Sequence, residues 1–140
     1  MNGLPESCVE ARRWIEKADN DLRNAECVLG MRENCPTDTV CFHCQQCAEK
    51  YLKAFLIFRN TAFPRTHDLV VLLNLAEEVG GLPLRVEQVQ PLNRYSVEGR
   101  YPGDWEPIAL EEASDALTMA RRVREVVRTM LPPSVLTGDH

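Results

Sequence analysis

The chain has 140 residues, of which 44% are hydrophobic and 26% are charged, and its formal net charge is −5. This size suits one domain with one core, and the acidic balance argues against a general nucleic-acid coat while allowing one local basic site. No apolar run reaches the roughly 18 residues that a membrane span needs. The first residues lack the pattern of a secretion signal, so a cytoplasmic location is expected.

The first predicted helix extends from Ser7 to Arg32, because apolar residues recur in it with a 3.6-residue period. Its apolar face comprises Ala11, Trp14, Ile15, Ala18, Leu22, Ala25 and Leu29. Ser7 followed by Glu10 has the spacing of a capping box and predicts the start of this helix. The segment Asn34-Cys35-Pro36 predicts its end, since proline disfavours helical backbone in the residue before it.

A second helix is predicted from Asp38 to Phe58, with two distinct faces at about 100° per residue. One face is a polar stripe of Gln46, Glu49, Lys50 and Lys53, and the other carries Cys44, Cys47, Ala48, Tyr51, Leu52 and Phe55. Glu49 precedes Lys53 by one turn, which is the order that favours an ion pair. We interpret the polar stripe as a solvated face, with ligand binding through its lysines as the alternative.

Six cysteines occur in the chain, and three of them lie in the pattern Cys41-x-x-Cys44-x-x-Cys47 around His43, with Cys35 upstream. The pattern resembles a metal or iron–sulfur box. On a helix, however, Cys41 and Cys47 lie about 9 Å apart along the axis, whereas a tetrahedral zinc site needs every thiolate about 2.3 Å from the metal. We therefore expect reduced, metal-free cysteines that fill small apolar positions, and no cofactor.

A third helix is predicted from Thr66 to Val79, with Thr66 as N-cap and a stop at Gly80-Gly81. Its buried face is expected to be Leu69, Leu72, Leu73 and Ala76. The segment Leu84–Gly99 is interrupted by Pro91, so we expect two short helices with a kink between them, followed by a loop over residues 100–107.

The last predicted helix begins near Pro107 and ends before Pro132-Pro133. Its expected apolar face is Ala109, Ala113, Ala116, Leu117, Ala120, Val123 and Val127. Acidic residues at its start and the stripe Arg121, Arg124 and Arg128 near its end complement the helix dipole. Residues 133–140 are expected to fray. No segment reads as a strand, so the sequence predicts an all-α antiparallel bundle.

Three blocks of this sequence together resemble the HEPN family of prokaryotic helical domains. The blocks are Gln45-Gln46-x-x-Glu49-Lys50-x-x-Lys53-Ala54, then Pro64-x-Thr66-His67-Asp68-Leu69, and finally the run from Tyr95 to Pro102. The resemblance covers nearly the whole chain and implies one domain over residues 1–140, folded as an up-and-down four-helix bundle with a short additional helix. It further implies a homodimer that partners a minimal nucleotidyltransferase in a toxin–antitoxin-like module and binds a nucleotide or RNA.

The resemblance also raises the question of ribonuclease activity, because catalytic members are metal-independent RNases with an arginine, four to six residues, and then a histidine. The histidines of this chain are His43, His67 and His140. Seven residues separate Arg59 from His67, one separates Arg65 from it, and Arg100 has no histidine after it before His140. The signature is therefore absent and we expect no enzyme, with two alternatives: an RNase that uses His67 with Arg59 or Arg65, and a helical adaptor without ligand.

The candidate nucleotide- or RNA-binding residues are Lys53, Arg65, His67, Arg100 and Tyr101. They offer cations for phosphate, a titratable ring and a stacking surface. The structural alternatives are that His67 merely caps or packs and that Arg100 pairs with Glu49. The set lacks a carboxylate cluster, so no dependence on divalent ions is expected. For the homodimer, the candidate contact residues are Phe42, Ile57 and Phe63.

Overall fold

The structure is a computed structural model that describes residues 5–96 and 107–137. Helices and loops make up these residues, with no strand among them, which confirms the all-α prediction. The α-helices are α1 (Glu6–Leu29), α2 (Thr37–Phe58), α3 (Leu69–Val79), α4 (Leu110–Thr129) and α5 (Pro133–Thr137). Three 3-10 segments accompany them, η1 (Arg32–Asn34), η2 (Val86–Gln88) and η3 (Gln90–Tyr95). Across the described residues, none of the helices has both the length and the apolar character that spanning a membrane requires.

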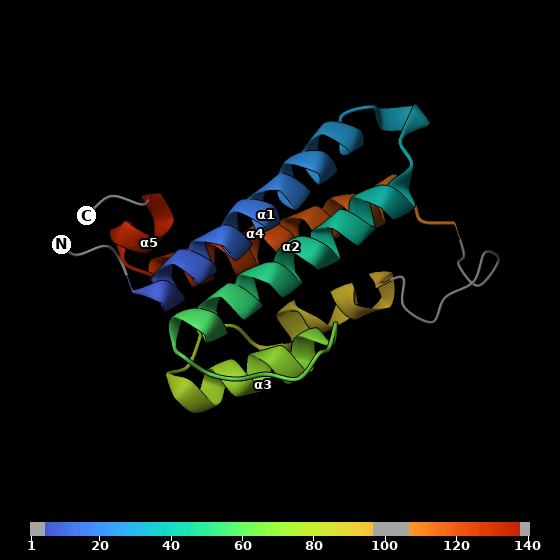
Figure 1. Cartoon of the computed structure of the whole chain (residues 1–140). Coiled ribbons are helices and arrows are strands. Elements are labelled where there is room, and N and C mark those ends of the chain that lie inside the picture. Colours follow the sequence, from blue (N-terminus) through green and yellow to red (C-terminus); the bar gives the residue numbers. More distant parts are fainter. Residues whose placement is uncertain (1–4, 97–106, 138–140) are drawn as a thin grey trace.

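The second helix, α2, is the centre of the molecule, because α1, α4, α3 and η3 all pack against it (Figure 1). Its large side chains Tyr51, Leu52 and Phe55 are fully buried. With neighbours on several sides the helix has no broad solvent face, so Glu49 and Lys53 are only 3% and 7% exposed. The interpretation of the polar stripe as a solvated face is therefore wrong for these two residues.

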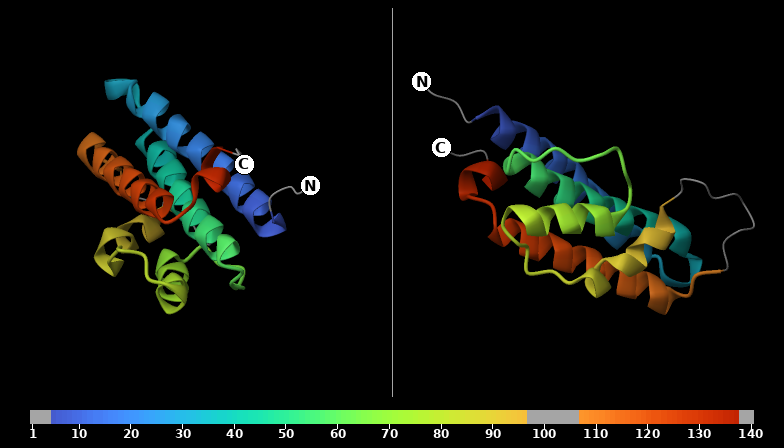
Figure 2. Two further views of the ribbon diagram at one scale, coloured as in Figure 1. Left: turned by 90° about the vertical axis from the view of Figure 1, so that its left-hand side faces the viewer. Right: turned by 90° about the horizontal axis from the view of Figure 1, so that it is seen from below.

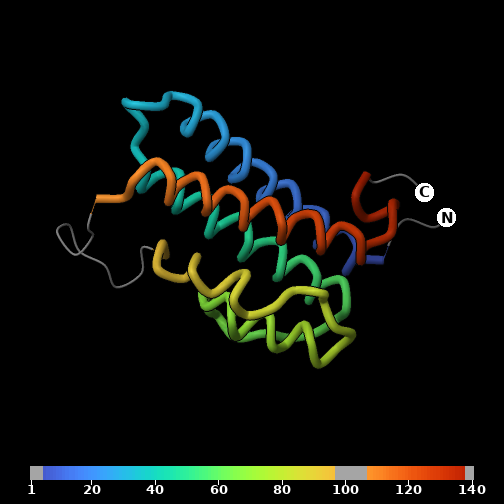
Figure 3. Tube along the Cα trace, turned by 180° about the vertical axis from the view of Figure 1, so that it is seen from behind, coloured from blue at the N-terminus to red at the C-terminus, as the bar shows by residue number. Residues whose placement is uncertain are grey.

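Helices α1 and α4 pack on α2 and also on each other, as the view from behind shows (Figure 3). Arg121 is paired with Glu26 at 2.6 Å, and Arg124 with Asp19 at 3.0 Å. Of the arginine stripe, Arg128 alone lies in the last turn of α4. The arginine stripe therefore links α4 to α1 through ion pairs. The predicted interaction with the helix dipole applies mainly to Arg128.

The helix starts differ from the predicted ones, most clearly in how α1, α3 and α4 begin. The N-cap of α1 is Pro5 without a side-chain hydrogen bond, so the capping box predicted from Ser7 and Glu10 is wrong. Helix α3 starts three residues after Thr66, because the Asp68 side chain caps it by accepting from the Val70 amide. Helix α4 starts at Leu110, with Ala109 exposed at its N-cap rather than part of the apolar face.

The two short helices expected from residue 84 onward are present as 3-10 turns, and Pro91 lies in the first turn of the second one. The expected fraying of residues 133–140 is wrong as far as Thr137, because residues 133–137 form α5. Val135 in α5 is fully buried, and α5 packs against α1. Proline at position 133 suits this helix, since the first helical position needs no amide hydrogen.

Helix α3 and the 3-10 segments η2 and η3 lie together on one side of the three long helices (Figure 2). The buried face of α3 is Leu69, Leu72, Leu73 and Ala76, as predicted. Gly80 ends it with φ of 153°, a conformation that side-chain-bearing residues rarely adopt. In the part of the chain that the structure describes, α1, α2 and α4 are the three long helices, and the shorter α3, of 11 residues, packs on α2 and η3.

Candidate functional site

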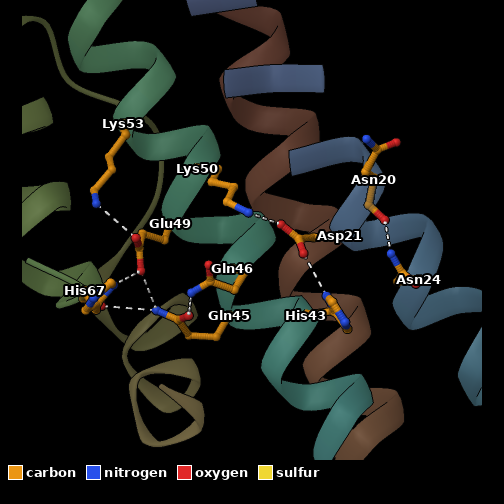
Figure 4. A network of polar contacts seen from close by, with 10 residues as sticks. All are labelled: Asn20, Asp21, Asn24, His43, Gln45, Gln46, Glu49, Lys50, Lys53 and His67. Atoms are coloured by element: carbon orange, nitrogen blue, oxygen red, sulfur yellow. Dashed lines mark hydrogen bonds and ion pairs between the residues drawn. The ribbon is translucent and has the colours of Figure 1, made fainter. Parts of the chain in front are cut away.

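The buried carboxylate of Glu49 organises the polar interior of the molecule (Figure 4). Its Oε2 accepts from Lys53 Nζ at 2.9 Å, which confirms the predicted ion pair. Its Oε1 accepts from Gln45 Nε2 at 3.0 Å and is 2.9 Å from His67 Nδ1. A carboxylate out of water needs such donors, because burying an unpaired charge is costly. Glu49 therefore fixes the positions of both Lys53 and His67.

The two glutamines of α2 attach the loop before α3 to this carboxylate. Gln45 Nε2 also donates to the backbone carbonyl of His67 at 3.2 Å, and Gln46 Nε2 donates to Gln45 Oε1 at 2.7 Å. Because a carboxylate can only accept, the imidazole of His67 donates to Glu49 from Nδ1. Both the backbone and the ring of His67 are thereby held against α2.

Asn93 in η3 holds the same loop from the other side. Its Oδ1 accepts from the Leu69 amide and its Nδ2 donates to Asp68 Oδ1, both at 2.9 Å. A cavity of about 430 Å³ lies here, lined by Thr66, His67, Asp68, Asn93 and Ser96. The His67–Asp68 turn is thus fixed between α2 and η3.

A larger cavity, which we call the Lys53 cavity, has a volume of about 520 Å³. It is lined by Trp14, Lys53, Phe63, Pro64, Arg65, Thr66 and His67. The Lys53 ammonium lies 5.6 Å from the ring centroid of Trp14 and 5.7 Å from that of Phe63. These distances allow cation–π attraction. The cavity thus combines a fixed cation, two aromatic rings and the exposed guanidinium of Arg65.

Three of the predicted binding residues, Lys53, Arg65 and His67, line this one cavity. Arg100 and Tyr101 lie outside the described residues, so their predicted roles stay predictions. Arg59 is elsewhere: it caps the end of α2, and its guanidinium carbon lies 5.8 Å from the Phe55 ring centroid. Arg59 follows Glu49, the partner of His67, by ten residues, about 15 Å along a helix, and it is not among the residues that line the Lys53 cavity with His67. Of the two arginines considered for an RNase, the geometry therefore favours Arg65.

Trp14 and Phe63 were not predicted as site residues. Trp14 has the helical spacing of a core residue, and Phe63 was considered a dimer contact. Both are half-buried and pack against the core while lining the cavity. Their aromatic character is compatible with either role, so a sequence pattern alone gives no signal that separates them.

A second buried carboxylate, Asp21 of α1, was also missed. Its Oδ1 lies 2.7 Å from His43 Nδ1 and its Oδ2 lies 2.6 Å from Lys50 Nζ (Figure 4). His43 was named beside the cysteines and among the histidines tested for an RNase signature, but no partner was predicted for it. Figure 4 shows Lys50 directed to Asp21 of α1 and Lys53 directed to Glu49 of its own helix, so the two lysines of the stripe pair with different carboxylates.

The cysteines of α2 are buried rather than gathered around a point. Cys41, Cys44 and Cys47 have no exposed surface. Burial raises the pKa of the Cys41 and Cys44 thiols to about 12 and also raises the pKa of Cys47. Within residues 5–96 and 107–137, no three His, Cys, Asp or Glu side chains are placed to hold a metal ion. The α2 thiols therefore stay protonated near neutral pH and serve as small apolar side chains.

Comparison with known proteins gives three matches. The family model of the HEPN domain matches residues 11–130. A protein of Methanocaldococcus jannaschii named "Putative toxin MJ1304" is 31% identical over 136 residues, which cover 86% of this chain and 88% of that protein. The crystal structure of TT1696 from Thermus thermophilus superposes with a TM-score of 0.69 at 28% identity, covering 88% of this chain and 99% of that one.

Proposed function

Because this chain belongs to the HEPN domain family, we propose that it is the helical member of a toxin–antitoxin-like module and binds a nucleotide or an RNA phosphate. The binding site is the Lys53 cavity. The name of the Methanocaldococcus jannaschii relative, a toxin, supports the first part of this proposal. The second part is carried by one observation: Glu49 holds the buried ammonium of Lys53 at 5.6 and 5.7 Å from two aromatic ring centroids.

The physical case for a phosphate ligand lies in how the cations are held. Lys53 has already lost its side-chain freedom to Glu49, so little further entropy is lost when an anion contacts it. Arg65 is exposed and, among the described residues, its side chain has no hydrogen-bond or ion-pair partner. A guanidinium binds phosphate in bidentate fashion, and Trp14 and Phe63 offer surfaces on which a base stacks.

The direct test is calorimetric titration of the protein with AMP and with a short oligoribonucleotide. We expect Arg65→Ala to weaken binding by about 10-fold, which corresponds to the loss of a charged hydrogen bond. Thermal stability should not change, because no described residue has a hydrogen bond or ion pair with the Arg65 side chain that the substitution would break. Arg122→Ala is a matched control, since Arg122 is exposed and lines neither of the cavities described above. Equal binding by the wild type and Arg65→Ala would contradict the proposed site.

Arg100 and Tyr101 lie outside the described residues, and their place in the binding site is predicted from the sequence alone. Arg100→Ala should weaken nucleotide or RNA binding by about 1–3 kcal/mol, the usual effect of removing a charged hydrogen bond. The free energy of unfolding should change less than the free energy of binding. Chemical denaturation measures the first and calorimetric titration the second. Unfolding without any loss of binding would make Arg100 a structural residue.

A second candidate function is RNA cleavage, favoured by the contact between Glu49 Oε1 and His67 Nδ1 at 2.9 Å. A carboxylate that orients an imidazole is the arrangement of a general base. Arg65 lines the same cavity and would stabilise the phosphorane. Cleavage of labelled RNA by the wild type in the presence of EDTA, lost in His67→Ala, would establish this activity. Intact RNA in both samples would leave binding as the function.

The protein partners belong to the proposal as well. We expect complex formation with a minimal nucleotidyltransferase encoded beside this chain, tested by co-expression and co-purification. We also expect a homodimer, tested by light scattering at micromolar concentration. The proposed contact residues Phe42, Ile57 and Phe63 are half-buried. A monomer at all concentrations, with no ligand and no copurifying enzyme, would favour a helical adaptor.

A further inference from the structure

A third cavity shares Trp14 with the Lys53 cavity as a wall. Its volume is about 390 Å³, and its lining is Glu10, Arg13, Trp14, Lys17 and Lys50. We call it the Lys17 cavity. Trp14 is held in place because its Nε1 donates to Glu10 Oε2 at 3.3 Å. Lys50 precedes Lys53 by three residues on α2, so the lysines that serve the two cavities lie about one turn apart.

The two cavities together reverse the charge of the protein locally. Their linings contain five cations, Arg13, Lys17 and Lys50 in one and Lys53 and Arg65 in the other. Among the described residues, Glu10 is the one carboxylate in these linings, although the whole chain has a net charge of −5. The carboxylates of Asp21 and Glu49 outside the linings pair with Lys50 and Lys53, so the excess positive charge is that of Lys17 and Arg65. This local excess of positive charge favours an anionic ligand.

Two of the three cations that line the Lys17 cavity already form ion pairs with carboxylates. Lys50 is bound to Asp21 at 2.6 Å, and Arg13 to Glu10 at 3.3 Å. Lys17 is exposed, and in the part of the chain that the structure describes its side chain has neither a hydrogen bond nor an ion pair. Lys17 thus corresponds in this cavity to Arg65 in the other, as an exposed cation beside a fixed lysine.

We propose that the two cavities together bind one single-stranded oligonucleotide, with one phosphate in each cavity and a base stacked on Trp14 between them. The inference rests on the proposed function, because the Lys53 cavity supplies the first phosphate site. The inference is based on the arrangement of the two linings: cations lie on either side of Trp14, which lines both cavities. Phosphates and bases alternate in the same way along a single strand. A mononucleotide engages the Lys53 cavity alone.

The test compares AMP with the tetraribonucleotide of adenosine, titrated into the wild type and into Lys17→Ala. We expect the tetranucleotide to bind at least about 10-fold tighter than AMP, and Lys17→Ala to remove most of that gain. The salt dependence of tetranucleotide binding should fall by about 0.7 in log–log slope, the value for one phosphate of a single strand. AMP affinity should not change in Lys17→Ala. Arg122→Ala should alter neither ligand.

Stacking is tested at Trp14 with two substitutions. Trp14→Leu should weaken tetranucleotide binding by about 10-fold, while Trp14→Phe retains most of the affinity because a phenyl ring still stacks. Thermal denaturation of both variants checks that the half-buried site still folds. If Trp14→Leu is unstable, Lys17→Ala and the salt slope still decide the matter.

The possible failures are distinguishable. Lys17→Ala could leave the affinity and the salt slope of tetranucleotide binding unchanged while Arg65→Ala weakens binding of both ligands. In that case the Lys17 cavity does not bind the strand, and the proposed function stands. If Lys17→Ala weakens AMP as much as the tetranucleotide, both cavities serve one nucleotide and the inference is wrong. If the wild type binds neither ligand, the proposed function fails together with the inference.

Discussion

At the scale of single residues, Glu49 and Lys53 show what a helical pattern reveals and what it does not. Their spacing of one turn predicts the ion pair, and the structure contains it at 2.9 Å. The same pattern suggested a solvated face, yet both residues are buried. Periodicity describes how side chains are arranged around one helix, whereas burial depends on how many neighbours that helix has. The neighbours of α2 come from distant segments of the chain.

The buried pair gives a prediction about stability. Glu49→Ala should lower the free energy of unfolding by about 3–5 kcal/mol, because it leaves the Lys53 ammonium buried without its partner. The double variant Glu49→Leu with Lys53→Met should recover most of that loss, since apolar side chains of similar volume replace both charges. Urea denaturation of the three proteins measures both values.

An exposed ion pair of α1 provides the control for that measurement. Glu10 and Arg13 are paired at 3.3 Å with side chains 46% and 69% exposed. A pair of this kind contributes less than about 1 kcal/mol. Arg13→Ala should therefore change stability little. A loss for Glu49→Ala as small as that for Arg13→Ala would mean that water reaches Lys53 and that the cavity is less preorganised than the geometry indicates.

The sequence predicted some residues of the candidate site and missed others. Lys53, Arg65 and His67 were named because the sequence blocks around them resemble a family, and they line one cavity. Trp14 was assigned to the core by its spacing. An aromatic residue at such a position can fill a core or line a cavity, and the choice is decided by which loop packs above it. Here that loop carries Phe63, which is far from Trp14 in sequence.

At the scale of helices and loops, the centres of the helices were predicted well and their ends less so. Thr66 and Asp68 are both good N-cap residues, and the sequence alone does not choose between them. The structure selects Asp68, whose carboxylate also accepts from Asn93 of η3 at 2.9 Å. A contact from another element thus decides where α3 begins.

The choice of cap can be tested by paired substitutions. Asp68→Ala should lower stability by about 1–2 kcal/mol, since it removes the acceptor for the Val70 amide and for Asn93. Thr66→Ala should cost clearly less, because its hydroxyl accepts one exposed amide hydrogen. Thermal denaturation of both variants gives the comparison. Equal losses would place the true start of the helix nearer to Thr66.

Helix α5 was missed because its sequence signals were read as a stop. Pro132 and Pro133 end α4, but a proline at a first helical position is equally compatible with a new helix. A segment of five residues is too short to show a period of its own. Its stability comes from the contact of Val135 with the rest of the core, which a local pattern does not reveal.

The contribution of α5 can be measured at Val135. Val135→Ala should lower the free energy of unfolding by roughly 1–2 kcal/mol, because it removes two buried methyl groups. Ser134→Ala should change it by less than about 0.5 kcal/mol, as expected for a substitution outside the core. Chemical denaturation separates the two values. If Val135→Ala proves as mild as Ser134→Ala, α5 is not docked in solution and the fraying expected from the sequence is correct.

At the scale of the whole molecule, the all-α class followed from composition and period because each long helix reports its own apolar face. The cavities did not follow, because they form where segments far apart in sequence meet. Trp14, Lys53 and His67 come from α1, α2 and the loop before α3. Which faces meet depends on the packing of all helices at once, and this information is spread over the whole chain.

The interior as a whole predicts a loss of stability in alkali. Burial is the largest cause that raises the pKa of Cys41, Cys44, Cys47, Tyr51 and Tyr95 above their ordinary values. The folded state therefore keeps these protons at a pH where the unfolded state has released them. Above about pH 9, where an ordinary thiol titrates, the unfolded state binds fewer protons, so stability falls as pH rises. The fall should continue until the folded groups titrate, near pH 12 for Cys41 and Cys44.

The thiol contribution can be isolated by replacing Cys41, Cys44 and Cys47 with alanine. Each buried group whose protons differ between the two states contributes up to about 1.4 kcal/mol per pH unit. Urea denaturation of the wild type between pH 8 and pH 11 should show a steeper decline than the alanine variant, although that variant starts from a lower stability because small cavities remain. The comparison concerns slopes, so the offset does not matter. Parallel slopes would mean that the three thiols are as accessible to hydroxide when folded as when unfolded, and that α2 is not the buried centre of the molecule.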